Sequence, residues 1–253
     1  MIPAALPAGE GRRSPRSGMT VALTGLLALL LVAGFVALGV WQVQRLAWKR
    51  ALIASVDARI HAPPIAAPAP AEWPSITAQA SEYRRISAHG VYRFDRQTLV
   101  RASTARGSGY WVMTPFDTGR GFTILVNRGF VPPGWKTESG NRPAAVTGLL
   151  RITEPGGGFL RANDPATGRW YSRDVAAIAR ALRLDRTAPY FIDAQAAGGP
   201  DALPVGGMTV VSFPNNHLVY AITWFALALM TAGGYMLFLR EERRLRTAGG
   251  GAG

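Results

Sequence analysis

Two long runs of apolar residues without any charge lie near the two ends of the chain and enclose a polar middle region. The first run covers residues 21–40 and the second covers residues 218–239. At a rise of about 1.5 Å per residue, a helix of either length spans the roughly 30 Å hydrocarbon core of a bilayer. The pattern therefore predicts a membrane protein with transmembrane helices over residues 19–43 and 214–239.

Basic residues flank the two runs unequally. Seven arginines lie beyond their outer ends, in residues 1–18 and 240–253, whereas three basic residues follow the first run directly and none immediately precedes the second. Because positive residues close to a span are retained in the cytoplasm, we expect both termini to be cytoplasmic and the middle region to be extracytoplasmic. The first run is longer than the roughly 7–15 apolar residues of a signal-peptide core, so we expect an uncleaved anchor. The arm at residues 1–18 is expected to be disordered, and so are residues 247–253, the end of the basic tail at 240–253.

The middle region has the pattern of an α+β domain. Residues 44–80 are expected to extend the first helix as an amphipathic segment and then to form a Pro/Ala linker, because proline cannot continue a helix. Residues 81–213 carry short β-rich runs separated by glycine and proline turns, with one amphipathic helix near residues 174–184. A mostly antiparallel sheet with one main helix is therefore predicted. The expected strands are 83–89, 98–102, 110–114 ending at Pro115, 122–127 ending at Gly129, 145–152, 189–193 and 208–213.

Composition narrows the chemistry that the chain can perform. It has no cysteine, which excludes disulfides, thiolate metal sites, covalent haem attachment and thiol nucleophiles. The formal net charge is +13, but the arginines of the middle region are scattered and lack interleaved stacking aromatics, so we expect a basic surface near anionic lipid or an acidic partner, and no nucleic acid. No phosphate loop, nucleophile elbow or zinc-protease motif is present, which favours a function other than catalysis.

One of the three histidines has an unusual position. His217 stands where the second apolar run begins, and Asn215 or Asn216 before it is a suitable helix cap. In the first turn of a helix, the positive end of the helix dipole disfavours protonation, which leaves the imidazole available as a ligand. Tyr220 and Trp224 follow at three and seven residues and so share its helical face.

The first run ends at the same membrane face, where aromatic and basic side chains again share one face of a helix. Trp41, Arg45 and Trp48 are spaced by four and three residues, again on one helical face. Two interpretations stay open, because aromatic and basic residues also form the ordinary belt at the ends of transmembrane helices. If the group is functional, a histidine ligand, flat aromatic walls and an arginine that pairs with a propionate suit a haem lying between the two helices.

An ordered series of segments runs from about residue 39 to residue 240. They are Leu38-Gly-Val-Trp-Gln-Val-Gln-Arg-Leu-Ala-Trp-Lys, Tyr83-Arg-Arg-Ile with Gly90, Gly109-Tyr-Trp-Val-Met-Thr-Pro, Leu125-Val-Asn-Arg-Gly-Phe-Val-Pro, Val146-Thr-Gly-Leu-Leu-Arg, Asn163-Asp-Pro with Trp170, and Asn215-Asn-His-Leu-Val-Tyr-Ala-Ile-Thr-Trp-Phe. The series resembles the Surfeit locus protein 1 family of cytochrome c oxidase assembly factors. The ordered set, rather than any single segment, is specific; one departure is Phe130, where tryptophan is commoner.

The resemblance implies a function. It implies a bacterial inner-membrane protein, not an enzyme, that helps to mature haem-copper (aa3-type) cytochrome c oxidase by holding haem a or helping to insert it into the largest subunit. The family's haem-linked histidine corresponds to His217, the expected iron ligand; Trp41, Trp224 and Tyr220 are expected to wall the macrocycle and Arg45 to pair with a propionate. Expected partners are the largest oxidase subunit, haem a synthase and membrane lipid.

Other interpretations remain open on the sequence. A membrane scaffold without a cofactor would stabilise the nascent oxidase subunit by contact alone. Copper delivery has little support, because the domain offers only the isolated Met113 and Met208 as soft ligands. A membrane sensor would need a longer cytoplasmic segment than the arginine-rich tail. The segment 127–129, Asn-Arg-Gly, has two interpretations. It suits a turn in which the glycine supplies a positive φ, and it equally suits docking to a partner.

Overall fold

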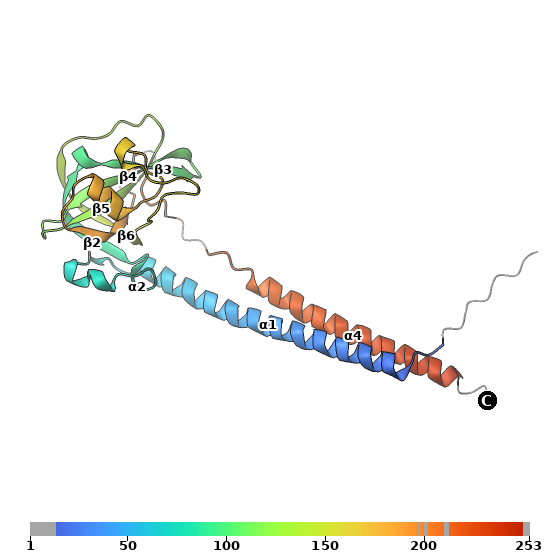
Figure 1. The fold of residues 1–253 in the computed structure, drawn as a ribbon. Coiled ribbons are helices and arrows are strands. Elements are labelled where there is room, and N and C mark those ends of the chain that lie inside the picture. Colours follow the sequence, from blue (N-terminus) through green and yellow to red (C-terminus); the bar gives the residue numbers. More distant parts are fainter. Residues whose placement is uncertain (1–13, 197, 200–201, 210–212, 250–253) are drawn as a thin grey trace, which may run out of the picture. The chain divides into compact units, whose positions relative to one another are not determined.

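The computed structural model describes residues 14–196, 198–199, 202–209 and 213–249. The chain forms two compact units, one made of residues 1–52 and 213–253 and the other of residues 53–212. Figure 1 shows a long helix pair in the first unit and a mostly-sheet domain, here called the outer domain, in the second. A mostly-sheet domain between two long apolar helices is therefore confirmed.

The helix pair consists of α1 (Gly18–His61) and α4 (His217–Gly249). Both are long and apolar enough to cross a membrane, by length and composition. Helix α4 continues through residues 240–249, so the basic tail is helical there and the disorder expected for residues 247–249 is wrong: the stretch lacks proline, and its arginines and glutamates favour a helix. Residues 1–13 of the expected arm and residues 250–253 of the expected tail lie outside the described residues.

The two helices pack along a seam with a seven-residue repeat. On each helix, the residues turned away from solvent alternate at spacings of three and four. This spacing keeps one face of each helix on the other over many turns, as in a left-handed coiled coil. The seam contains Ala28, Val32, Phe35, Gly39, Gln42 and Leu46 of α1, and His217, Ala221, Trp224, Ala228, Thr231, Tyr235 and Phe238 of α4.

Glycines of α1 let large aromatic side chains of α4 approach closely. A Cβ on Gly39 would lie 2.7 Å from the ring of Phe225, and one on Gly25 would lie 2.3 Å from the hydroxyl of Tyr235. That hydroxyl donates to the carbonyl of Val21 at 3.2 Å, in the next turn of α1. The pair is therefore joined by close van der Waals contact, as is common where small residues line a helix interface.

The predicted Pro/Ala linker is part of the outer domain. Prolines do end α1 at His61, but the following residues form β1 (Ile65–Ala66), the 3₁₀ helix η1 (Pro70–Ser75) and α2 (Ala78–Ser81). Ala67 is buried in the core, and Trp73 meets Phe122 edge-on at 5.8 Å. The expectation of an unpacked linker up to residue 80 is therefore wrong, because its few apolar side chains fill gaps in the core.

Within the described residues, seven strands form the sheet of the outer domain in the order β1-β2-β6-β7-β5-β4-β3. A second pairing of β2 with β4 closes five of them into a ring. The ladders are antiparallel except for β1–β2 and β5–β7, which are parallel. Their bounds are β2 (Arg85–Arg93), β3 (Thr98–Thr104), β4 (Gly107–Asp117), β5 (Thr123–Val131), β6 (Asn141–Ile152) and β7 (Thr187–Ala194), and the short helices are η2 (Phe94–Arg96), η3 (Pro165–Thr167) and α3 (Val175–Ala181).

Three predicted strands differ from the structure. Strand β4 runs through Pro115, which pairs with Leu125 of β5, and β5 runs through Gly129 to Val131. Of the strand expected at 208–213, residues 208, 209 and 213 are not in a strand, and residues 210–212 lie outside the described residues. Both extensions have the same origin: β4 and β5 pair with each other on both sides of the punctuating residue, so tertiary pairing overrides the local signal.

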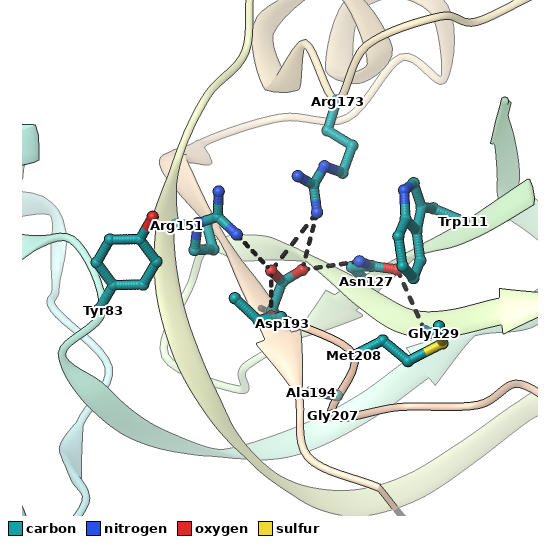
Figure 2. A pocket seen from close by; sticks show the side chains of 11 residues that line it. Tyr83, Trp111, Asn127, Gly129, Arg151, Arg173, Asp193, Ala194, Gly207 and Met208 are labelled. Atoms are coloured by element: carbon teal, nitrogen blue, oxygen red, sulfur yellow. Dashed lines mark hydrogen bonds and ion pairs between the residues drawn. The ribbon is translucent and has the colours of Figure 1, made fainter. Parts of the chain in front are cut away.

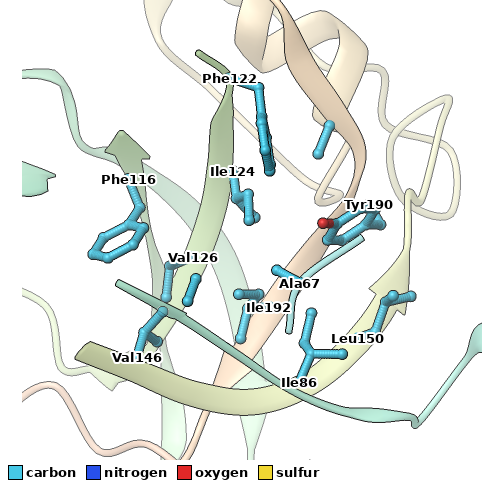
Figure 3. Packing of buried hydrophobic residues seen from close by; sticks show 12 residues of the cluster. Ala67, Ile86, Phe116, Phe122, Ile124, Val126, Val146, Leu150, Tyr190 and Ile192 are labelled. Carbon is cyan, nitrogen blue, oxygen red and sulfur yellow. The ribbon is translucent and has the colours of Figure 1, made fainter. Parts of the chain in front are cut away.

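The core lies on both faces of the two central strands. Alternate residues of β5 and β7 point into the ring, where they meet residues of β2, β4 and β6 (Figure 3). The residues between them, Leu125 and Phe191, point the other way, against Ile178 of α3. Burial on both faces explains why β5 and β7 are almost continuously apolar and pair in parallel. The ring is filled by Ile86, Phe116, Phe122, Ile124, Val126, Val146, Leu150, Tyr190 and Ile192.

Tyr92 makes the outer domain sensitive to alkaline pH. Its ring stacks on Phe94 at 5.4 Å and meets Phe116 edge-on at 4.8 Å. Burial raises the pKa of Tyr92 from 10.0 to about 12, against the opposing positive charge of Arg128. The unfolded chain loses the phenol proton of Tyr92 near pH 10, while the folded domain keeps it. The contribution of Tyr92 to the free energy of unfolding is therefore complete below pH 10. We expect it to fall by about 2–3 kcal/mol as the pH rises to 12.

Urea unfolding of the whole chain in detergent, measured from about pH 9 to about pH 11, checks this expectation. Tyr92→Phe should flatten the fall in unfolding free energy, because phenylalanine keeps the ring contacts and has no proton to lose. Burial also raises the pKa of Tyr190, which stays in both proteins and adds the same slope to each. Equal pH slopes for the two proteins would contradict the assignment to Tyr92.

Candidate functional site

His217 begins α4, and its ring is held by a residue of α1. Its Nδ1 lies 2.8 Å from Oε1 of Gln42, a buried side chain of the seam. Because the amide oxygen only accepts hydrogen bonds, this contact makes Nδ1 the protonated nitrogen and leaves the lone pair on Nε2. A histidine fixed in this tautomer by a neighbouring carbonyl-type oxygen is oriented as metal-binding histidines usually are.

The other two predicted residues of α4 lie in different surroundings. Trp224 stacks on Phe35 of α1, with ring centroids 5.8 Å apart and an interplanar angle of 26°, inside the seam. Tyr220 is more than half exposed. The predicted shared face is therefore divided, because the seam takes up Trp224 and leaves Tyr220 on the surface of the pair.

The predicted residues of α1 lie on another face of that helix. Trp41 is more than half exposed, and the guanidinium of Arg45 stacks 4.2 Å above the ring of Trp48. Each residue of a helix turns by about 100°, so these three share a face that is distinct from the one where Gln42 and Leu46 meet α4. The structure thus does not gather Trp41 and Arg45 around His217.

Gln42, the residue that contacts His217 directly, was not among the predicted site residues. A signal for it was present: Phe35, Gly39, Gln42 and Leu46 follow each other at spacings of four, three and four, the repeat of a helix seam. A single polar residue in such a seam is expected to find a partner on the facing helix. Among the residues that the structure describes, no group of three or more metal-binding side chains occurs, so His217 is a single-ligand candidate.

A second polar site lies in the outer domain, around a buried carboxylate (Figure 2). Asp193 of β7 is 6% exposed, and Arg151 and Arg173 approach it at 2.9 and 3.2 Å. Asn127 donates to its Oδ1 at 2.7 Å and Thr209 donates to its Oδ2 at 2.8 Å. The cluster borders a cavity of ≈ 240 Å³, lined also by Tyr83, Trp111, Gly129, Ala194, Gly207 and Met208.

The arginines of this cluster are neutralised by several acids. Arg151 also pairs with Glu82 at 3.2 Å, and Arg173 pairs with Glu154 at 2.5 Å. Burial lowers the pKa of Arg151, but the negative charges around it, Asp193 foremost, more than offset this, so the pKa is raised above its ordinary value. Both oxygens of Asp193 are occupied, so the carboxylate has no free position for acid–base work. We interpret the cluster as a structural clasp between β5, β6 and β7.

The segment 127–129 is explained by the same clasp. Asn127 donates to Asp193, and its Oδ1 accepts from the backbone N–H of Gly129 at 3.2 Å. Gly129 has φ 128°, as the expectation of a positive φ required. Arg128 pairs with Glu138 at 2.8 Å and lies 4.6 Å over the ring of Phe94. Residues 127–129 lie within β5, so the expected turn is wrong, whereas the expected positive φ of Gly129 is confirmed and both the asparagine and the glycine have structural roles.

Comparisons with known proteins agree with the resemblance. The profile of the SURF1 family matches residues 29–229. The chain is 34% identical over 239 residues to Surfeit locus protein 1 of Mus musculus, covering 85% of this chain and 75% of that protein. It is 34% identical over 245 residues to Surfeit locus protein 1 of Homo sapiens (87% and 78%) and over 228 residues to the SURF1-like protein of Monosiga brevicollis (81% and 83%). The chain therefore belongs to the SURF1 family.

Proposed function

We propose that this protein is an assembly factor for haem-copper (aa3-type) cytochrome c oxidase that holds haem a and helps to insert it into the largest subunit. Membership of the SURF1 family, which the sequence resemblance links to oxidase assembly, supports this role. Two helices with the length and composition of membrane spans support a site at a membrane, in a bacterium the inner membrane, with both termini cytoplasmic.

The contact between His217 and Gln42 carries the haem part of the proposal. It engages Nδ1 of His217 and leaves Nε2, the nitrogen that we propose as the ligand of haem iron, outside this hydrogen bond. A partly exposed imidazole at the first residue of α4 is accessible, while its partner is buried in the seam and holds the ring in one orientation. A histidine that only formed part of an interfacial belt would not need such a partner.

The packing of the pair supports a binding site for haem a on its surface. At the level of His217, the seam is filled: Ala221 is buried and Gly39 lies against Phe225. We infer that a macrocycle does not lie between α1 and α4, the position expected from the sequence. Tyr220 remains the exposed aromatic one turn along α4 and can cover one edge, whereas Trp224 is used for packing. We infer that haem a is held at an open surface that the receiving subunit completes.

This arrangement defines the roles of the remaining proposed residues and partners. Trp41 and Arg45, on their separate face of α1, are proposed to contact lipid headgroups or the oxidase subunit instead of haem. The largest oxidase subunit is the proposed recipient, and haem a synthase is a proposed donor. The protein is proposed to carry its cargo without converting it, so no enzymatic step is assigned.

The absorption spectrum of protein purified from cells that also make haem a tests the ligand. We expect His217→Ala to lose the haem a band, while His89→Ala, at an exposed position of the outer domain, should keep it. Gln42→Leu should lower haem affinity by about 10-fold or more, because the loss of an orienting partner typically costs 10–100-fold in metal binding. An undiminished haem a band in His217→Ala would show that another residue is the iron ligand.

A scaffold without a cofactor is the second candidate function. It is favoured by the stacking of Trp224 on Phe35, which uses an expected haem wall for helix packing. This function predicts colourless protein even when haem a is made, together with retention of the oxidase subunit in a pull-down. The same purification distinguishes the two, because only the haem-holding function gives a band that depends on His217.

A further inference from the structure

A two-residue hairpin in the outer domain presents apolar side chains to solvent. Gly158 and Arg161 exchange backbone hydrogen bonds of 2.8 and 3.1 Å, which leaves Phe159 and Leu160 as the two loop residues. Phe159 is 92% exposed and Leu160 is 89% exposed. Neither belongs to a core cluster, so the packing of the domain does not account for two large apolar residues at this tip.

The backbone of the tip is also unfavourable for its sequence. Leu160 has φ 55°, in the left-handed region that asparagine and glycine adopt readily and leucine does not. Two-residue hairpins usually carry those small residues. A leucine here costs both backbone strain and exposure to water, and such a combination is typical of residues that contact a ligand or partner.

Two arginines beside the tip lack acidic partners. The guanidinium groups of Arg101 and Arg161 lie 5.8 and 5.6 Å from the centre of the same ring, that of Tyr171. In the described part of the chain, neither side chain makes an ion pair or a hydrogen bond, whereas Arg151 and Arg173 each contact two or more carboxylates. Two like charges held on one ring attract an anion.

A cavity of ≈ 420 Å³ adjoins these groups. It is lined by both arginines, Tyr171, Phe159 and Tyr110, with Ser103, Ser108 and Pro133 among the other lining residues. We propose that this cavity and the hairpin tip form a docking site for a segment of a partner protein in which a carboxylate side chain stands next to an apolar one. The guanidinium groups would accommodate the carboxylate, and Phe159 and Leu160 would cover the apolar side chain.

The chemistry of the site favours a short acidic segment. An arginine binds a carboxylate by charge-assisted hydrogen bonds, and the ring of Tyr171 helps to keep both guanidinium groups in place. The apolar tip adds contact area, which free small anions such as acetate cannot use. The proposal uses only residues of the outer domain, so it stands or fails independently of haem binding at His217.

Binding of two peptides to the whole chain in detergent tests the site. Fluorescence anisotropy is measured with a labelled acetyl-Gly-Phe-Glu-Leu-Glu-Gly amide and with its glutamine counterpart. We expect the glutamate peptide to bind and the glutamine peptide to bind about tenfold more weakly, since a neutral amide cannot form charge-assisted hydrogen bonds with the guanidinium groups. Arg161→Gln should weaken the binding of the glutamate peptide by about the same factor. Arg180→Gln, an exposed arginine of α3, is the matched control.

Three outcomes decide the matter. Weaker binding in Arg161→Gln and in a Phe159→Ser, Leu160→Gly double variant, with Arg180→Gln unchanged, supports the site. Equal binding of the two peptides, or no effect of Arg161→Gln, overturns it. A Phe159→Trp variant in nanodiscs gives the third: quenching of its fluorescence by brominated anionic lipid, with no peptide binding, would show that the tip enters a membrane and would overturn the protein-segment proposal.

Discussion

Asp193→Ala is expected to lower the unfolding free energy of the outer domain by about 3–5 kcal/mol, the range for removing one partner of a buried ion pair. The carboxylate is almost fully buried and is the common partner of Arg151 and Arg173. Alanine would leave two buried guanidinium groups facing each other with less negative charge between them. It would also remove the acceptor of the Asn127 and Thr209 hydrogen bonds. The charge term and the hydrogen-bond term therefore act in the same direction.

Urea unfolding of the whole chain in detergent, followed by near-ultraviolet circular dichroism, measures this loss. Asp193→Asn separates the two terms, because it keeps the shape and one acceptor oxygen but removes the charge; we expect an intermediate loss. Asp164→Asn is the matched control, since Asp164 also pairs with an arginine, Arg169, at 3.0 Å but does so at the surface. A midpoint for Asp193→Ala equal to that of the control would show that the arginines find solvent or other acids without cost.

The same variant also separates the outer domain from the proposed haem site. Asp193 belongs to the outer domain, whereas His217 and Gln42 belong to the helix pair. We therefore expect the haem a band per folded molecule to be unchanged in Asp193→Ala, while the amount of folded protein falls, because unfolded protein is removed in cells. If Asp193→Ala lost as much of the haem a band per folded molecule as His217→Ala does, the clasp would also support haem binding.

The helix pair was largely predictable from the sequence, and its contacts were only partly so. Apolar length fixes where a helix can span a bilayer, and both runs are helical. Which face of each helix meets the other depends on the small residues and the seven-residue repeat, which an inspection for aromatic and basic residues does not detect. This is why Trp41 and Arg45 were expected beside His217, whereas Gln42 is its partner.

The outer domain shows a different limit. Strand positions were recovered wherever alternation and turn residues agreed, as for β2, β3 and β7. The clasp around Asp193 was not predicted, because its members come from five separate segments and no member's residue type points to a buried cluster on its own. Arginine and aspartate are usually exposed, and only the fold brings them together in a buried position. The linker was misjudged for the same reason: burial of Ala67 is a property of the closed ring, not of the segment.

Gly129→Ala is expected to destabilise the outer domain by about 3 kcal/mol or more, since backbone strain of about 1–3 kcal/mol and overpacking of about 1–3 kcal/mol both apply. Gly129 has φ 128°, which an alanine rarely adopts. Its Cβ would also lie 2.1 Å from the carbonyl oxygen of Val205. That segment cannot simply move away, because Val205 and Phe130 exchange backbone hydrogen bonds of 2.8 and 2.9 Å.

Gly119→Ala provides a comparison at a glycine that has a positive φ but no close neighbour. Gly119 also has a positive φ, 68°, but a Cβ there meets nothing within 4 Å. We expect a loss of about 1 kcal/mol from the backbone alone, so the difference between the two variants in urea unfolding measures the steric part at Gly129 together with the greater backbone strain of φ 128°. Equal losses would show that the 205 segment yields without cost. In that case the positive φ alone, and not the close approach of Val205, would require a glycine at position 129.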